Sequence, residues 1–274
     1  MKASLIISTY NWTEALNLCL QSVIQQSRLP DEIIIADDGS DNNTRELLKN
    51  FQSKTKIPLK HVWHPDQGFQ LSVIRNKAIL VAAHEYIIQI DGDLILHADF
   101  VKDHLVLATK GKFVSGSRLL LPPNFTTKLL HQQKIPSNQT LLLAGDNRLN
   151  GIRIPFLTKH LSPIYKKNKP FYVKGCNMAF WRDDLFIVNG YNEKISGWGK
   201  EDSELAIRLI NYGVNRLFIK FGGICYHLFH REASRNREGL NDSILNETLR
   251  THKVRCEKGI DSHSLDEIIV FSNS

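Results

Sequence analysis

Two carboxylates on either side of a glycine, Asp91-Gly92-Asp93, stand directly after the apolar run at residues 86–90. Glycine permits a tight turn there, and carboxylate oxygens are preferred ligands of hard divalent cations such as Mg²⁺ and Mn²⁺, which proteins often share with substrate phosphates. Ligands of open α/β sheets bind beyond the carboxyl ends of the strands. The position of this triplet after an apolar run therefore favours a metal or phosphate site over a solvated turn.

A second acidic turn, Asp37-Asp38-Gly39-Ser40-Asp41, follows the apolar run at residues 32–36. One interpretation is an Asx-type turn that caps the following helix. The other is a carboxylate that accepts hydrogen bonds from a ribose or a base edge, as acidic residues do in nucleotide-binding folds. The residues alone leave both interpretations open.

The sequence Gly197-Trp198-Gly199-Lys200-Glu201-Asp202 precedes an amphipathic helical pattern over residues 202–212. Capping and the helix dipole explain acidic side chains in a first turn without any further function. They do not explain a tryptophan between two glycines. Glycines let a loop approach a ligand closely, and an exposed indole face is a platform for a sugar. A carboxylate held beside that platform is a candidate general base.

Three further side chains are candidates for ligand contacts. His227 and His230 stand three residues apart, and such a pair can converge on one metal where the backbone turns; they can equally be two unrelated histidines. No cysteine has the spacing of a zinc site, and carboxylate with imidazole donors suits Mn²⁺. Arg75 is a candidate diphosphate ligand, with a surface salt bridge as the alternative.

Strand-like and helix-like patterns alternate in the first 100 residues and predict the elements that position these groups. Strands that alternate with helices indicate an α/β fold with a mostly parallel central sheet flanked by helices. The later part of the chain predicts a strand at 177–181, a short helix from Asp183, and a strand at 225–230. The other expected elements are strands at 3–8, 32–36, 59–63 and 86–90 and helices at 12–26, 44–51, 71–83, 202–212 and 240–252.

The composition is that of a folded globular chain, with 42% hydrophobic and 23% charged residues. No apolar run approaches the length of a membrane span, and the first residues lack a signal-peptide pattern. The four cysteines are widely scattered, as is typical of reduced thiols. These features predict a cytoplasmic protein.

The positive charge is concentrated in the middle of the chain. The net charge is +7, and residues 110–182 contain 13 basic residues and one acid, Asp146. Residues 118–172 contain several prolines and little periodicity, which predicts a long, mobile insertion over the sheet. We therefore divide the chain into residues 1–117, the basic insertion 118–171 and residues 172–274, with the first and last parts as two halves of one domain.

Several enzyme classes are excluded because their motifs are missing. The chain has no GxxxxGK[ST], no GxGxxG after its first strand and no GxSxG. In contrast, five segments in order resemble the family 2 glycosyltransferases of the GT-A fold. The last of them, residues 197–230, is similar to the C-terminal motif of β-galactosyltransferases and chondroitin-polymerase-type enzymes. The first four are Ile6-Ile7-Ser8-Thr9-Tyr10-Asn11, Ile35-Ala36-Asp37-Asp38-Gly39-Ser40-Asp41, Asp91-Gly92-Asp93 and Lys174-Gly175-Cys176-Asn177-Met178-Ala179.

The resemblance implies that residues 1–117 are a nucleotide-sugar-binding half and that residues 172–274 are an acceptor-binding and catalytic half, and it implies a role for each candidate residue. The turn at 9–11 and Asp38 would hold uracil and ribose, with Asp37 in support. Asp93, with Asp91, would bind a Mn²⁺ (or Mg²⁺) that bridges the UDP diphosphate, and His227 and His230 would complete that site. The nucleotide-sugar contacts implied in full are Thr9, Tyr10, Asn11, Asp37, Asp38, Arg75, Asp91, Gly92 and Asn177.

The implied reaction is an inverting transfer to a hydroxyl of a glycan acceptor. Asp202 would be the catalytic base, Glu201 would contact the donor or acceptor sugar, and Trp198 with Gly197 would line the acceptor site. Related galactosyltransferases have more acids after the Glu-Asp pair, whereas Ser203 follows here, so the donor stays open among hexoses and N-acetylhexosamines, with galactose favoured.

The basic insertion indicates an anionic partner, for which a lipid-linked or phosphorylated glycan near an anionic cytoplasmic leaflet is the leading interpretation. That setting would be bacterial lipopolysaccharide or capsule synthesis. A solvated basic face is the alternative, and a nucleic-acid partner is disfavoured because the segment has few aromatic residues for stacking. A non-catalytic nucleotide-sugar-binding protein and a sugar nucleotidyltransferase are the competing functions.

Overall fold

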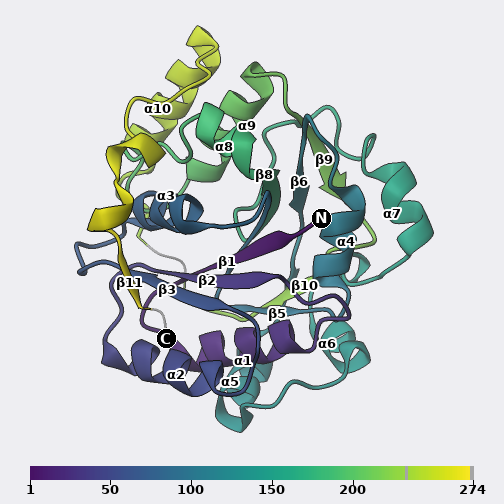
Figure 1. Cartoon of the computed structure of the whole chain (residues 1–274). Helices are drawn as coiled ribbons and strands as arrows, with labels where there is room; N and C mark the ends of the chain where they lie inside the picture. Colours follow the sequence, from purple (N-terminus) through teal and green to yellow (C-terminus); the bar gives the residue numbers. More distant parts are fainter. Residues whose placement is uncertain (232–233, 272–274) are drawn as a thin grey trace.

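The computed structural model describes residues 1–231 and 234–271. Its centre is an eight-stranded sheet with the order β11-β3-β2-β1-β4-β8-β6-β9 (Figure 1). The first part of the chain supplies four neighbouring parallel strands. The predicted alternation is confirmed, with β1 (Ala3–Thr9), α1 (Thr13–Ile24), β2 (Glu32–Asp37), α2 (Asn42–Gln52), β3 (Leu59–Trp63), α3 (Leu71–Val81) and β4 (Tyr86–Asp91).

The later part of the chain completes the sheet with strands of both directions. β8 (Asn177–Trp181) pairs antiparallel with β4 and with β6 (Lys112–Gly116). β9 (Asn215–Ile219) pairs parallel with β6, so both run parallel to β4. β11 (Ile269–Phe271) is an antiparallel edge strand on β3. The sheet is mostly parallel, as predicted, although the sequence pattern indicated only β8 among these four strands.

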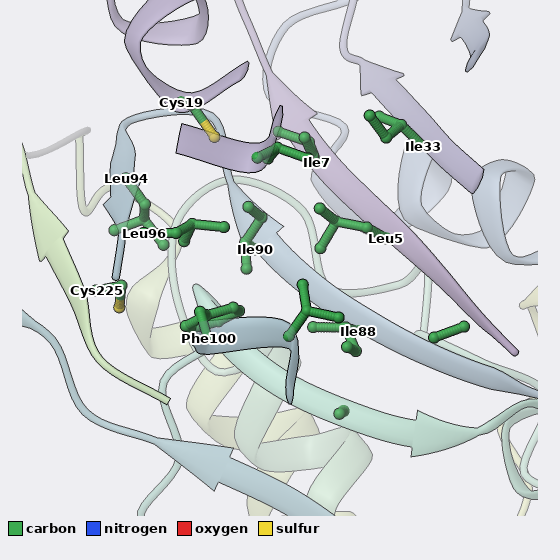
Figure 2. Packing of buried hydrophobic residues seen from close by; sticks show 14 of the residues in the cluster. Leu5, Ile7, Cys19, Ile33, Ile88, Ile90, Leu94, Leu96, Phe100 and Cys225 are labelled. Atoms are coloured by element: carbon green, nitrogen blue, oxygen red, sulfur yellow. The ribbon is translucent and has the colours of Figure 1, made fainter. Parts of the chain in front are cut away.

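Helices cover both faces of the sheet (Figure 1). On one face lie α1, α2 and α4 (Phe100–Leu107), and on the other lie α3, α8 (Arg182–Ile187), α9 (Glu201–Asn211) and α10 (Glu238–Thr251). Side chains alternate along a strand, so Leu5 and Ile7 belong to the first core cluster and Ile6 to the second. Figure 2 shows the first cluster, where Cys19 of α1 and Phe100 of α4 pack near the strands. Burial of both faces explains why these strands are continuous apolar runs.

A second, three-stranded sheet lies against α1 and consists of β5 (Leu94–Leu96), β10 (Cys225–His227) and β7 (Leu119–Leu120). β10 pairs antiparallel with β5, which places His227 opposite Leu94. The expected strand at 225–230 therefore ends at His227. This pairing brings a residue from the end of the chain next to the turn that follows β4.

The middle segment forms helices, in contrast to the expected stretch without regular structure. It contains α5 (Pro123–Gln132), α6 (Asn138–Ala144), the 3₁₀ turn η1 (Arg148–Asn150) and α7 (Pro155–Leu161). Pro123 and Pro155 are the first residues of their helices, where proline has no intrahelical N–H bond to lose. Leu129 and Leu141 are buried in one cluster with Leu18 of α1. Two of the prolines that indicated an irregular insertion, Pro123 and Pro155, thus mark helix starts.

Among the described residues, none of the helices combines the length and the apolar character that crossing a bilayer requires.

Candidate active site

The candidate residues meet at the carboxyl ends of the parallel strands. β1, β2 and β4 are in register so that Thr9 lies opposite Asp37 and Ser8 lies opposite Asp91. The three polar turns that follow these strands therefore share one edge of the sheet, as the position of the acidic turns predicted.

Arg75 of α3 is the centre of the site and is only 1% exposed. Its guanidinium donates hydrogen bonds to Asp91 Oδ1 (2.9 Å), Asp202 Oδ1 (3.0 Å) and Ser8 Oγ (3.2 Å). Its Nη1 atom also lies 3.6 Å from Glu201 Oε1. The surface salt bridge considered for Arg75 is therefore wrong, and all three nitrogens point to protein groups.

Glu201 and Asp202 occupy the first turn of α9, as expected. Glu201 is 8% exposed, and its Oε2 atom has no hydrogen-bond partner among the described residues. Burial and the adjacent charge of Asp202 raise the pKa of Glu201 to about 8. Asp202 is more accessible, and the Tyr191 hydroxyl approaches its Oδ1 to 3.5 Å. Tyr191 also donates to Gln89 Oε1, which ties this corner to β4.

The lack of a side chain at Gly175 leaves space for the Asp202 carboxylate. A methyl group at Gly175 would lie 2.1 Å from Asp202 Oδ2, far inside van der Waals contact. The backbone around Gly175 cannot easily retreat, because its carbonyl accepts a hydrogen bond of 2.9 Å from the buried Gln89 side chain. The sequence singled out Gly175 only as part of a motif, since the clash involves a residue 27 positions away.

Asp93, His227 and His230 converge as the spacing of the two histidines allowed. Their ligand atoms all lie within 4.8 Å of one another. The Nε2 atoms of His227 and His230 are 3.3 and 3.1 Å from Asp93 Oδ2, and Asp93 Oδ1 is buried without a partner among the described residues. One carboxylate, two imidazoles and an unused buried oxygen fit a divalent transition metal. Asp91 points instead to Arg75.

The protonation of the two histidines differs. The hydrogen bond with Asp93 raises the pKa of His230 to about 9, whereas burial lowers the pKa of His227 to about 4. Burial alone would raise the pKa of Asp93, but its hydrogen bond with His230 and the charges of both histidines lower it. In the absence of a cation, a proton on His230 thus compensates the buried carboxylate.

The turn after β1 is tied to the turn after β2. Asn11 has a left-handed φ of 43°, its N–H donates to Ser40 Oγ, and its Oδ1 accepts from the Asp41 N–H. Tyr10 is half exposed and donates to Asp66 Oδ2 at 2.9 Å. Together with Thr9 these residues form an accessible rim beside the carboxyl ends of β1 and β2.

Asp37 and Asp38 are both buried, and each has both oxygens in contact with protein groups. Asp37 Oδ2 is 2.7 Å from His61 Nε2, and its Oδ1 accepts from the Ser40 N–H. Asp38 Oδ1 is 2.8 Å from His64 Nε2, and its Oδ2 accepts from the Gln70 N–H. The capping interpretation holds for Asp41, whose side chain caps α2.

Residues 64–70, after β3, belong to the site although they were not among its predicted members. Gly39 (φ 96°) approaches them so closely that a methyl group there would lie 2.5 Å from Asp66 Cα. At the other end, Phe69 O accepts a hydrogen bond from the Gly197 N–H. Applying the strand-end rule to the third predicted strand would have found His64 and Asp66.

Gly197 and Trp198 lie in a loop held by α10. The Asn241 side chain donates to the carbonyl oxygens of Ser196 (3.2 Å) and Gly199 (3.0 Å). The Arg235 guanidinium lies 4.5 Å from the centre of the Trp198 ring. One face of the indole is therefore covered, in contrast to the exposed platform expected.

Gly92 and Asn177 were both expected to contact the sugar nucleotide, and the structure places them differently. Gly92 allows the turn to approach β1, since its N–H donates to Ser8 O at 2.8 Å. Asn177 is not brought to the open side of the site. Its side chain is fully buried and donates to Ser117 O and Gly223 O, while its Oδ1 is 2.9 Å from His104 Nε2. The arrangement does not support the expected sugar-nucleotide contact of Asn177, because its buried amide joins β8 to the loops at Ser117 and Gly223 and to His104 of α4.

The fold and this site define a member of glycosyl transferase family 2, whose family model matches residues 4–185, more than half of the chain. The chain belongs to that family, as its resemblance indicated. A second model, described as the N-terminal domain of galactosyltransferase, matches residues 159–231.

Relatives with known names share this region. Chondroitin synthase of Escherichia coli is 29% identical over 238 residues, which cover 82% of this chain and 34% of that protein. Validoxylamine A glucosyltransferase of Streptomyces hygroscopicus subsp. limoneus is 25% identical, with 77% of this chain and 48% of that protein covered. The chain thus spans between a third and a half of these relatives. YfnE of Bacillus subtilis, named as an uncharacterized glycosyltransferase, is 32% identical over 96% of this chain and 73% of its own length.

Solved structures support the GT-A fold. A mannosyltransferase from Pyrobaculum calidifontis in complex with GDP-Man and Mn²⁺ superposes with a TM-score of 0.63 at 17% identity, covering 91% of this chain and 64% of that one. Staphylococcus aureus TarS 1–349 in complex with UDP gives 0.58 at 16% identity, covering 92% and 72%. At these identities the likeness shows the fold, which confirms the predicted fold class.

The contact between Gly175 and Asp202 predicts the effect of one added methyl group. Gly175→Ala would displace the Asp202 carboxylate by about 1 Å, a misplacement that costs roughly 100-fold in turnover when the group takes part in chemistry. Initial rates of sugar transfer, with a thermal melt to show that the variant folds, check this. Gly239→Ala in α10, where nothing lies within 4 Å, is the matched control. Equal rates for both variants would contradict the role of this contact.

The raised pKa of Glu201 predicts a pH dependence of stability. The folded state keeps the proton up to about pH 8, whereas the unfolded state loses it near the ordinary value of 4.5, so stability falls as the pH rises between these values. Glu201→Gln does not titrate. Its stability advantage over the wild type should grow by roughly 1–4 kcal/mol between pH 5 and pH 8. Denaturant unfolding at both pH values measures it, with the exposed Glu247→Gln as control; parallel pH profiles would refute it.

Proposed function

We propose that the protein transfers a hexose or N-acetylhexosamine from a UDP-sugar to a hydroxyl of a glycan acceptor, with inversion and with a bound divalent cation. One observation carries the proposal: the Arg75-centred cluster of Asp91, Glu201 and Asp202 lies directly beside the Asp93–His227–His230 cluster. Sugar hydroxyls and a metal-bound diphosphate are the two parts of one donor, and residues 91 and 93 join the two clusters.

The donor nucleotide would bind along the rim formed by the turn at residues 9–11 and the turns after β2 and β3. Tyr10 offers an exposed ring there, and Asp37 would support the turn. The Asp38 oxygens already bind His64 and Gln70, so a ribose contact by Asp38 would share those bonds. The neighbour structure of TarS with UDP supports a uridine donor, whereas the mannosyltransferase with GDP-Man supports a guanosine one. A donor panel should contain both.

Asp93, His227 and His230 would hold Mn²⁺, or Mg²⁺ in its place. When bound, the ion supplies Lewis-acid stabilisation of the negative charge on the departing diphosphate. Arg75 would not contact the diphosphate, because its nitrogens bind Ser8 and the carboxylates; its role would be to position them.

Asp202 would act as the general base. The hydrogen bonds of Asp202 in the described structure go to Oδ1, which leaves Oδ2, beside Gly175, to take the proton of the acceptor hydroxyl. The acceptor oxygen then bonds to the anomeric carbon while the bond from that carbon to the diphosphate oxygen breaks. Glu201, protonated near neutral pH and with Oε2 unpartnered, would hydrogen-bond to a sugar hydroxyl.

The acceptor would approach past Gly197 and Trp198. Arg235 lies over the Trp198 ring and Arg237 lies against Gly197, so cations flank this entrance. Cations at the entrance support an anionic acceptor, and the similarity to the chondroitin synthase of Escherichia coli supports a polysaccharide one. Lipopolysaccharide or capsule synthesis would be the setting. Galactose is favoured as the transferred sugar because the galactosyltransferase model matches this region.

A catalytic role for Asp202 predicts a separation of binding from turnover. Asp202→Asn should keep UDP binding within about threefold and lower transfer by a factor on the order of 100–10,000, because the amide cannot take the proton. Titration calorimetry with UDP and rates of UDP release measure the two. Ser203→Ala on the same helix is the control. Turnover that survives the substitution would favour a different base, and a wild type that binds UDP without any turnover would favour the non-catalytic binding protein.

The metal cluster predicts dependence on a divalent cation. UDP release from the preferred donor, found with a panel of UDP-sugars and GDP-mannose, should stop with a chelator and return with Mn²⁺. His227→Ala should raise the Mn²⁺ concentration for half-maximal rate by about tenfold or more, since it removes one of three ligands. The exposed His131→Ala is the matched control. A rate that is insensitive to the chelator would reject the metal site.

A further inference from the structure

A basic surface occurs at the edge of the molecule formed by α7 and the loop after it. A cavity of about 560 Å³ lies between this segment, the end of α4 and the first residues of β6 and β9. Among the described residues, four cations and no acid line it. We define the basic surface by the side chains of Lys112, Lys159, Lys166, Lys167, Lys169 and Arg216.

The charges of this surface are not compensated. Within residues 1–231 and 234–271, no carboxylate lies within 4.0 Å of any of these six cations. Arg216 instead donates to the backbone oxygens of Tyr172 and Lys166, and burial lowers its pKa. The Lys166 ammonium lies 4.0 Å from the centre of the Tyr172 ring. By contrast, nearby Arg153 forms a salt bridge with Asp103. Acidic side chains therefore occur in this region, but among the described residues none of them pairs with the six cations of the basic surface.

Large apolar side chains protrude among these cations. Phe156 of α7 is 72% exposed and Ile164 in the following turn is 63% exposed. On α7, Phe156 and Lys159 are three residues apart and share the outer face, while Thr158 faces inward and donates to Phe221 O at 2.7 Å. Exposed apolar groups beside lysines are typical of surfaces that lie in the interface of a bilayer.

The basic surface is remote from the catalytic groups. Lys112 is the first residue of β6 and Arg216 the second of β9, and both strands run parallel to β4, whose last residue is Asp91. Lys112 and Arg216 therefore lie at the end of the sheet opposite Asp91, whereas α7 lies along the edge strand β9, with Thr158 bonded to Phe221 O just after the end of that strand. In Figure 1, α7 and α4 stand on the right, on the side of the N-terminus.

We propose that the basic surface docks the protein on an anionic phospholipid bilayer. The lysines contact headgroup phosphates, and Phe156 and Ile164 enter the interfacial region. The protruding isoleucine favours a bilayer over a soluble polyanion, because a hydrated polyanion offers nothing apolar to an aliphatic side chain.

Sedimentation with vesicles tests the proposal. The full chain should bind vesicles of phosphatidylcholine with 25% phosphatidylglycerol, should not bind pure phosphatidylcholine, and should dissociate as NaCl is raised, because salt screens the attraction. Lys159→Gln/Lys167→Gln/Lys169→Gln should weaken binding about 100-fold, at about fivefold per lysine. The control Lys54→Gln/Lys56→Gln/Lys128→Gln removes equal charge from exposed lysines elsewhere and should stay within about threefold of the wild type.

A second variant separates a bilayer from a soluble polyanion. Phe156→Ser/Ile164→Ser should weaken vesicle binding by about tenfold or more and leave binding of dextran sulfate unchanged. No binding to the anionic vesicles, equal losses in the two lysine variants, or a Phe156/Ile164 variant with wild-type vesicle affinity would each overturn the proposal. UDP release without vesicles should be the same in all variants, so a failure of the proposed enzymatic function would appear in a different assay.

Discussion

The site depends on one buried cation. A guanidinium removed from water is tolerated only where carboxylates compensate its charge, so Arg75 requires acidic groups from β4 and α9 to meet at one point. These elements lie in different parts of the chain, and the ion pairs join them. Burial raises the pKa values of Glu201 and Asp91, and the neighbouring carboxylates, which the one guanidinium of Arg75 cannot all neutralise, raise them further. Under the proposed function, a diphosphate could bind beside such an acidic group only with a cation between them, which is the place of the Asp93 cluster.

A second buried ion pair fixes α9 from behind. Arg208 forms an ion pair with Glu204, one turn before it on α9, and both side chains are fully buried. The guanidinium also donates to Gly190 O, and Glu204 Oε1 accepts from Thr248 of α10. The start of α9 is thus held by two ion pairs, between Arg75 and Asp202 and between Arg208 and Glu204. The position of Asp202 is set by polar contacts that tolerate little adjustment, because each leaves a buried charge if it is broken.

The sequence was informative where a local rule applies and uninformative where contacts are distant. Apolar runs predicted the parallel strands, and their polar ends located Asp37, Asp91 and Asp93 correctly, because parallel strands deliver their carboxyl ends to one edge. The helices of residues 118–171 were missed, since Pro123 has opposite meanings inside a helix and at its start. Asn177 has the residue type of a ligand contact, and only its burial and its partners show that it joins β8 to the loops at Ser117 and Gly223.

The charge asymmetry of the sequence corresponds to a separation in space. The acidic turns follow the carboxyl ends of β1, β2 and β4, whereas Lys112 and Arg216 stand at the starts of β6 and β9, with Lys166 and Lys167 of the loop after α7 beside them. If the two were mixed at one edge, the lysines would pair with the carboxylates around Arg75 and compete with it. Because the strands are parallel, the acidic turns and these cations are separated by the length of a strand. That distance is longer than the Debye length in physiological salt, so the two sets of charges are largely screened from each other. The same polarity that assembles the acidic site thus leaves the opposite edge available for a surface of the other sign.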